Sequence, residues 1–298
     1  MTYSMVARDP SSGQLGVAVQ SHYFSVGSIV TWAEPGVGAI ATQSFAEPAY
    51  GPRGLELIRS GRSAAGALGE LIDEDAGEAT RQVAIIDNAG RVAVHTGRSC
   101  IAEAGHQVGD QVSAQANMMR RDTVWHAMID AYSATQGDLA TRLIAALEAA
   151  ESEGGDIRGR QSAAILVVGG RRSERPWEQR LFDLRVEDHP NPLPELSRLI
   201  DLKRAYDHLN EAEQLILGGD VQHALEHYEQ ATAAAPDNLE FVFWHGVTLA
   251  AAGRVPEARA MLDRAYAAND GWAELLRRLV AVGLIPEDPE LMRALLPA

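Results

Sequence analysis

The sequence predicts an α+β layered sandwich, followed by a smaller all-α region. Up to about residue 190 the elements arrive in pairs: paired strands, two helices, paired strands, two helices and paired strands. Paired helices between antiparallel strands indicate helices packed on the faces of sheets, whereas a parallel sheet alternates single strands and helices. Further on, alanine and leucine become abundant and strand signals end. We therefore predict one domain at 1–190 and a second at 195–298, divided by the proline-rich segment 188–194.

The first predicted element is a β-hairpin near the start of the chain. Two apolar runs, 3–7 and 15–19, flank a segment of Asp, Pro, Ser and Gly, which are turn residues. No polar segment precedes the hairpin, so we expect the chain to begin inside a sheet, although first residues usually fray. Removal of Met1 would leave Thr2 with a free α-amine at a strand end. A threonine activated by its own amine is a recognised nucleophile. The alternative is that Thr2 is only a β-branched strand former.

The remaining elements of the first domain follow from apolar spacing and turn residues. Further strands are predicted at 26–32, 37–44, 82–87, 91–96, 107–116, 161–168 and 181–186. Helices are predicted at 48–58, 63–73, 122–135 and 138–151. Ser63 is expected to cap the second helix, and Asp122 and Asp138 to cap the third and fourth.

The all-α region contains a repeat with a period of 34 residues. Four positions recur at this offset: Gly219 and Gly253, Ala224 and Ala258, Ala231 and Ala265, and Pro236 and Asp270. The period and the small residues resemble the tetratricopeptide repeat, a helix-turn-helix unit, although Asp270 departs from its closing proline. About two units are present, fewer than the three usually needed for independent stability. We therefore expect the repeats to pack on the first domain or on a second subunit, which predicts a homo-oligomer, or to dock a partner protein.

Composition excludes several classes of function. A net charge of −15 would repel nucleic acid, so no nucleic-acid partner is expected. The apolar runs are too short for a membrane span and no signal peptide is recognisable, so we expect a cytoplasmic protein without a membrane partner. The single cysteine, Cys100, rules out an internal disulfide and a cysteine-rich metal site. No glycine-rich nucleotide motif is present, and His223 and His227 lack a third ligand nearby, so no cofactor and no metal are predicted.

Polar clusters end several of the apolar strands. Three of them are Gln20-Ser21-His22, Thr42-Gln43-Ser44 and Gln115-Ala116-Asn117. Buried polar groups cost free energy unless they have partners, so a cleft between sheets is a natural place for them. The alternative is that they are hydrogen-bonded strand ends with no reactive role.

A fourth cluster, residues 154–162, leads directly into an apolar strand. It contains Asp156, Arg158, Arg160, Gln161 and Ser162. The arginines could clamp a substrate carboxylate, or they could hold Asp156 in a structural ion pair that closes the loop. Ser162 could become a new N-terminus by self-cleavage, but Gln161 precedes it in place of the glycine often found there.

Five segments, taken in order, resemble the DUF1028 family. They are residues 1–10, 16–22, 36–43, 50–55 and 159–166, and the likeness extends over about residues 1–190. That family, of unknown function, is assigned to the N-terminal-nucleophile (Ntn) hydrolase-like fold. The resemblance implies a four-layer αββα sandwich, consistent with the element order. It does not imply a reaction, because one fold hosts unrelated functions.

What the resemblance implies for chemistry centres on Thr2 as nucleophile, with its own α-amine as base through a water. A core lysine, used by proteasome-type Ntn hydrolases, is excluded because Lys203 is the only lysine. Asn117 or Gln43 could donate to an oxyanion, and His22 could shuttle a proton. The expected substrate is a small-molecule amide, contacted by residues of the polar clusters: Ser21, Thr42, Gln43, Asp156, Arg158, Arg160 and Gln161. The competing hypothesis is a non-catalytic binding protein whose repeats dock a partner.

Overall fold

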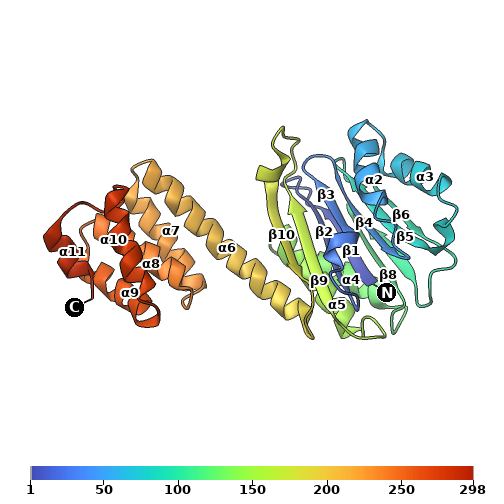
Figure 1. Ribbon diagram of the computed structural model, residues 1–298. Helices are drawn as coiled ribbons and strands as arrows, with labels where there is room; N and C mark the ends of the chain where they lie inside the picture. The colour runs from blue at the N-terminus through green and yellow to red at the C-terminus, as the bar shows by residue number, and fades with distance from the viewer. Residues whose placement is uncertain (1, 298) are drawn as a thin grey trace. The chain divides into compact units, whose positions relative to one another are not determined.

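The computed structural model describes residues 2–297 (Figure 1). Contacts between residues divide the chain into two compact units, one up to Ile200 and the other from Asp201 onward. The division falls inside helix α6 (Pro192–Leu217), which begins within the proline-rich segment and continues into the second unit. Each unit is described by itself below.

The first unit contains two antiparallel sheets. In the six-stranded sheet the order is β10 (Arg180–Val186), β9 (Ser162–Val168), β2 (Leu15–Ser21), β1 (Thr2–Arg8), β8 (Val112–Asn117) and β7 (Gly105–Gly109). In the four-stranded sheet it is β3 (Thr31–Glu34), β4 (Gly38–Ser44), β5 (Arg81–Asp87) and β6 (Val92–Thr96). Strand β1, which carries Thr2, is therefore central in the larger sheet.

Helices cover the outer faces of both sheets (Figure 1). Helices α4 (Val124–Ala134) and α5 (Leu139–Ser152) share one apolar core with the larger sheet. Helices α2 (Tyr50–Arg59) and α3 (Ala64–Asp73) share another with the smaller sheet. A third core lies between the two sheets. The unit is thus a four-layer αββα sandwich, as the sequence and the resemblance together led us to expect.

Alternation along β1 decides what each of its side chains meets, because successive side chains of a strand point to opposite faces. Tyr3, Met5 and Ala7 belong to the core shared with α4 and α5. Val6 belongs to the core between the sheets, and the Ser4 hydroxyl hydrogen-bonds to Gln43 of the smaller sheet. Thr2 has the same parity as Ser4 and Val6, so its side chain lies on the face between the sheets.

Three local expectations were wrong. Residues 27–30 of the predicted strand 26–32 form a short helix, α1 (Gly27–Val30), before β3 begins at Thr31. The predicted strand 107–116 is a hairpin, β7 and β8, which turns at Gln111 with a positive φ of 56°. The N-cap of α4 is Thr123, without a side-chain hydrogen bond, and not Asp122.

The two aspartates predicted as caps offer a direct comparison. Asp138 caps α5, and its carboxylate accepts from the backbone N–H of Thr141 at 2.8 Å. Asp138→Ala should lower the free energy of unfolding by about 1 kcal/mol, because an orphan N–H at the helix start loses its acceptor. Asp122→Ala, at an exposed position that does not cap α4, should change it by less than about 0.5 kcal/mol. Urea denaturation of both variants checks this, and equal losses would contradict the assignment of the caps.

The second unit is helical and carries the 34-residue repeat. After α6 it contains α7 (Val221–Ala234), α8 (Leu239–Ala251), α9 (Val255–Ala268), α10 (Gly271–Ala281) and α11 (Pro289–Leu295). The recurring alanines Ala224, Ala231, Ala258 and Ala265 are all fully buried. Small residues at these positions let neighbouring helices approach closely, which explains why they recur.

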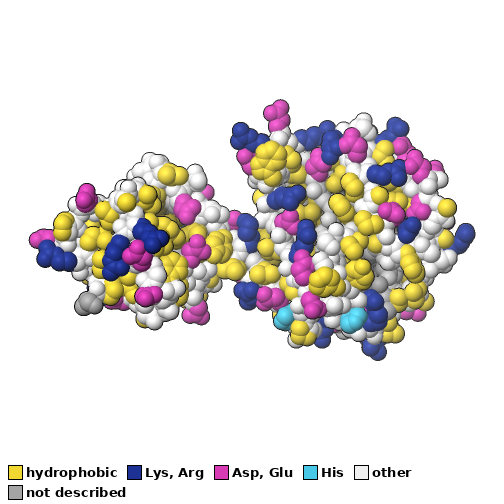
Figure 2. All heavy atoms as spheres, viewed as in Figure 1, with side chains coloured by type: hydrophobic (Ala, Val, Ile, Leu, Met, Phe, Trp, Pro, Cys, Tyr) yellow, Lys and Arg dark blue, Asp and Glu magenta, His cyan; other side chains and the backbone are white. Residues whose placement is uncertain are grey.

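On the face shown in Figure 2, acidic and basic side chains lie between groups of apolar ones. None of the helices in residues 2–297 is both long enough and apolar enough to cross a bilayer.

Candidate active site

A cleft of about 370 Å³ opens at the end of the sandwich where β1 begins. Its lining comes from the start of β1, the segment after β2, the end of β4 and the loop that follows it, and the start of β5. The lining residues are Thr2, Tyr23, Val26, Ile29, Gln43, Ser44, Phe45, Ala46, Pro48 and Arg81. The volume lies in the range typical of small-molecule sites.

The hydroxyl and the carbonyl oxygen of Thr2 both have hydrogen-bond partners. It pairs with Asn117 in the β1–β8 ladder and is only 5% exposed. Its hydroxyl donates to the Ser21 hydroxyl at 3.1 Å. Its carbonyl oxygen accepts from the side-chain amides of Gln43, at 3.3 Å, and Asn117, at 3.4 Å. Thr2 therefore lies in a preorganised polar pocket at the cleft.

Gln82 of β5 orients both of these amides. Its side-chain oxygen accepts from Gln43 Nε2 at 2.7 Å and from Asn117 Nδ2 at 2.9 Å. Its own nitrogen donates to the Thr96 hydroxyl at 3.0 Å and to the Ala116 carbonyl at 2.8 Å. Gln82 is fully buried, so these contacts have no competition from bulk water. The amide groups around Thr2 consequently have one defined orientation.

The polar network continues between the sheets behind Thr2. The Ser4 hydroxyl donates to Gln43 Oε1 at 2.6 Å and accepts from Gln115 Nε2 at 2.7 Å. Gln115 Oε1 accepts in turn from the Ser113 hydroxyl at 3.1 Å. All of these side chains are buried. A connected and satisfied network of this kind gives a core a single arrangement.

Backbone strain is concentrated beside the cleft. Four non-glycine residues among 2–297 have a positive φ, and three of them adjoin the site: Ser25 at 56°, Ser44 at 71° and Met118 at 60°. Ser44 directly follows Gln43, and Met118 directly follows Asn117. Such conformations cost free energy and are typical of functional sites, where the surrounding structure maintains them.

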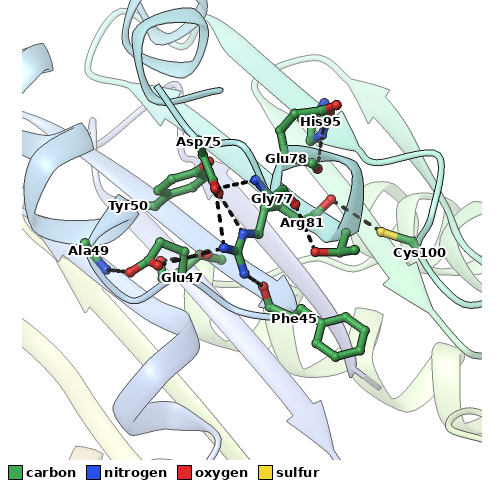
Figure 3. A network of polar contacts seen from close by, with 12 residues as sticks. Phe45, Glu47, Ala49, Tyr50, Asp75, Gly77, Glu78, Arg81, His95 and Cys100 are labelled. Atoms are coloured by element: carbon green, nitrogen blue, oxygen red, sulfur yellow. Dashed lines mark hydrogen bonds and ion pairs between the residues drawn. The ribbon is translucent and has the colours of Figure 1, made fainter. Parts of the chain in front are cut away.

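Arg81 contributes a fixed positive charge to the cleft (Figure 3). Its Nε donates to Asp75 at 2.7 Å, and Nη1 donates to the Phe45 carbonyl at 2.6 Å. The Tyr50 hydroxyl also donates to Asp75, at 2.9 Å. The hydrogen bond from Arg81 lowers the pKa of Asp75 to about 2. Burial, together with the hydrogen bond to Asp75, raises the pKa of Tyr50.

The Asp75–Arg81 pair predicts a defined loss of stability in acid. Because the folded-state pKa of Asp75 is depressed, the pair stabilises the fold fully above the ordinary aspartate pKa of about 4. This contribution should disappear as the pH falls through about 2, where the folded-state carboxylate takes up a proton. Asp75→Asn should remove the pH-dependent part. Urea midpoints of both proteins between pH 6 and pH 2 test this, and parallel curves would contradict it.

The structure brings four of the predicted site residues together and places the others elsewhere. Thr2, Ser21, Gln43 and Asn117 form the cluster described above. Thr42 is buried, and its hydroxyl donates to the Glu47 carbonyl at 3.2 Å, so it fixes the loop after β4. Met1, whose removal the nucleophile hypothesis requires, lies outside the described residues.

The predicted residues of the 154–162 cluster form ion pairs outside the cleft lining. Arg158 pairs with buried Asp156 at 3.1 Å. Arg160 pairs with Glu151 at 3.2 Å, and that carboxylate accepts from the Tyr3 hydroxyl at 2.7 Å. Burial, with Glu151 beside it, raises the pKa of Tyr3. This arrangement agrees with the structural alternative for the arginines.

The other residues named from the sequence have local partners. Gln161 donates to Asp188 at 3.2 Å. The His22 ring lies 3.3 Å from the Arg160 carbonyl, and its backbone N–H donates to Asp156 at 3.1 Å. The Ser162 hydroxyl donates to the Tyr23 carbonyl at 2.5 Å and shapes the segment after β2.

Cys100 and His223 also have ordinary surroundings. The Cys100 thiol donates to the Arg81 carbonyl at 3.3 Å (Figure 3). His223 pairs with Asp220 at the exposed start of α7. No group of three or more metal-binding side chains occurs in residues 2–297.

Two important residues of the site were missed. Gln82 is a polar residue beside the first apolar positions of its strand, and the polar-cluster argument applied to Gln43 would also have found it. The sequence did not indicate a role for Arg81, because a charged residue at the start of a strand is usually exposed to solvent. Only the folded chain reveals that Ser44 and Arg81, partners in the β4–β5 ladder, both line the cleft.

Fold and site together define an αββα sandwich protein with a threonine hydroxyl in a small-molecule-sized cleft at the start of a central strand. The chain belongs to DUF1028, a family of unknown function, whose model matches residues 2–196. A tetratricopeptide-repeat model matches residues 215–282.

Two solved structures resemble the chain to different degrees. A crystal structure of a DUF1028 protein from Silicibacter pomeroyi is 31% identical, covers 66% of this chain and 87% of its own, and has a TM-score of 0.60. Anbu, an ancestral beta-subunit from Yersinia bercovieri, is 14% identical over 72% of this chain and 96% of its own, with a TM-score of 0.33. None of the curated proteins matches the chain.

Proposed function

We propose that this protein is an Ntn-type amidohydrolase that cleaves an amide or related C–N bond in a small molecule, with Thr2 as nucleophile. The observation that carries the proposal is the position of Thr2. It lines a cleft of about 370 Å³ at the start of a central strand, with its carbonyl clamped by two buried amides. A nucleophile needs access to substrate on one side and a rigid support on the other.

The proposed reaction has two steps. The Thr2 oxygen attacks the substrate carbonyl carbon, and its proton passes to the α-amine that removal of Met1 would free. An α-amine has a pKa of about 8, so a substantial part is neutral near pH 7–8 and can act as base. The C–N bond breaks, the leaving amine takes up the proton, and an ester to Thr2 remains. Water then hydrolyses this ester, releasing the carboxylic acid and the original hydroxyl.

The buried amides act in this scheme through Thr2. Both Gln43 and Asn117 donate to the Thr2 carbonyl and to Gln82. These two hydrogen bonds use both side-chain N–H groups of Asn117, so none is left to donate to an oxyanion. We therefore assign them a positioning role instead of the oxyanion contact expected from the sequence. Ser21 accepts from the Thr2 hydroxyl and is the neighbour best placed to orient it.

Intact-mass spectrometry of untagged protein from a bacterial cytoplasm tests the first requirement. We expect a mass lacking one methionine and no further cleavage, which leaves the Thr2 amine free. Amine release from a panel of N-acyl compounds then tests turnover. Retention of Met1 in the purified protein would block the base and refute the Thr2 mechanism.

A second candidate function, binding of a partner protein, is favoured by an apolar groove in the helical unit. The groove has a volume of about 240 Å³, and Ile216, Leu217, Trp244 and Val247 are among the residues that line it. Leu217 is 79% exposed and adjoins the other apolar residues of the lining, and a contiguous exposed apolar patch is typical of an interaction site. Leu217→Asp should abolish such binding and leave amide turnover unchanged. Unchanged binding of the partner by this variant would refute the binding role of the groove.

A further inference from the structure

Arg81 is the only charged residue among the ten described residues that line the cleft. Five of the other nine are apolar: Val26, Ile29, Phe45, Ala46 and Pro48. The protein as a whole carries a net charge of −15, so its average field repels anions. Arg81 is therefore the one charged side chain of this lining, and it would attract an anionic group together with the Thr2 α-amine, which removal of Met1 would free and which is partly protonated near pH 7–8.

The Arg81 side chain is fixed but has donor capacity left. It is 18% exposed and makes hydrogen bonds with Asp75 and the Phe45 carbonyl. These contacts use three of the five guanidinium N–H groups, so two are not committed to Asp75 or Phe45. Glu47 is the second carboxylate near Arg81, 3.9 Å from Nη2, and is not part of the cleft lining. Arg81 thus has the fixed donors that a carboxylate ligand requires.

The apolar part of the lining defines the rest of the ligand. Val26, Ile29 and Pro48 line the same cleft as Arg81 and Thr2, and the exposed Tyr23 and Phe45 rings add aromatic surface. Aromatic and aliphatic side chains of a ligand gain free energy by leaving water against such a wall. A ligand that satisfies both parts has an apolar side chain and a negative charge.

We propose that the cleft binds N-acylated amino acids with an apolar side chain, whose carboxylate is received by Arg81 while the amide lies toward Thr2. This inference rests on the proposed function for the identity of the scissile bond, but the binding of the carboxylate can be measured without turnover. Arg81 is then the residue that determines specificity. Asp75 and the Phe45 carbonyl hold its guanidinium in place.

The test compares two probes on full-length Thr2→Ala protein, which cannot consume them by the proposed route. N-acetyl-L-phenylalanine carries the carboxylate, and N-acetylphenethylamine has the same amide and ring without it. Titration calorimetry should give at least about tenfold tighter binding of the acid, the effect expected for charge-assisted hydrogen bonds. Equal binding of the two probes, or no binding of the acid, would overturn the proposal.

Two variants in the same Thr2→Ala background separate recognition from folding. Arg81→Gln should weaken binding of the acid toward that of the neutral probe, with little change for the neutral probe itself. The α-amine at residue 2 is present in both proteins, so the loss reports on Arg81 alone. Glu47→Gln removes a competing carboxylate from a half-buried residue that does not line the cleft. It should tighten binding of the acid by about two- to fivefold and leave the neutral probe unchanged. If Arg81→Gln does not fold, the Glu47→Gln result decides, and an unchanged ratio of affinities refutes the proposal.

The outcome for binding is distinguishable from the outcome for catalysis. Carboxylate-dependent binding without hydrolysis by the wild type would support the ligand class and refute the Thr2 reaction. Hydrolysis of the neutral probe as fast as the acid would support the reaction and refute the role of Arg81.

Discussion

Thr2→Ala is expected to abolish amide turnover, lowering kcat by at least about 10³-fold, because the hydroxyl that forms the ester is absent. Alanine is also small, so removal of Met1 should continue and the free amine is retained. The fold should persist, since Thr2 contributes a single side-chain hydrogen bond, to Ser21. Release of amine from the best substrate of the panel, measured at saturating concentration, gives the result.

Two further variants make the Thr2 test specific. Thr2→Ser restores a hydroxyl on the same strand and should recover a substantial part of the activity. Thr31→Ala removes a threonine at the start of β3 that is 8% exposed and bonds only locally, to the Gly27 carbonyl at 2.8 Å. This control should retain turnover. Activity in Thr2→Ala equal to the wild type would eliminate Thr2 as the nucleophile.

Gln82→Met is expected to give the largest loss of stability among substitutions at the site. Methionine has a similar length but cannot accept from Gln43 and Asn117 or donate to Thr96. Each buried polar group left without a partner costs about 1–3 kcal/mol, so we expect about 3 kcal/mol or more in the free energy of unfolding. Urea denaturation measures this loss.

The same substitution should also reduce turnover in protein that remains folded, because the amides that clamp the Thr2 carbonyl lose their orientation. Gln136→Met, in the exposed loop between α4 and α5, provides the matched control and should change stability by less than about 0.5 kcal/mol. Wild-type stability in Gln82→Met would mean that the network does not support the site. Full turnover at reduced stability would separate the network from catalysis.

Much of the fold could be predicted because its signals are local. Ser63 and Asp138 cap α3 and α5 as expected, since a side-chain oxygen before an apolar helical stretch satisfies a free N–H. The errors came from segments in which one continuous apolar pattern covers two secondary-structure elements. The segment 26–32 begins with a helical turn. The segment 107–116 turns at Gln111, where a positive φ is adopted by a glutamine and not by the glycine that would have indicated a turn.

The candidate site was predicted in part for the same reason. Thr2, Ser21, Gln43 and Asn117 stood out as polar residues at the ends of apolar strands, and burial required them to find partners. Asp156, Arg158 and Arg160 stood out equally, yet they form ion pairs away from the cleft lining. Residue type and local position cannot distinguish these two outcomes.

The sequence by itself determined the order of paired strands and paired helices, two of the three predicted helix caps and the 34-residue repeat, because each depends on residues close together in the chain. The tertiary structure alone decided which strand ends meet. Thr2 pairs with Asn117 across 115 positions, and Gln43 and Gln82 face each other in the second sheet. That register is set by packing between the two sheets, which is a long-range effect. Burial of Val6, Ala41 and Ala84 between the sheets fixes the polar residues two positions away on the same strand faces: Ser4, Gln43 and Gln82.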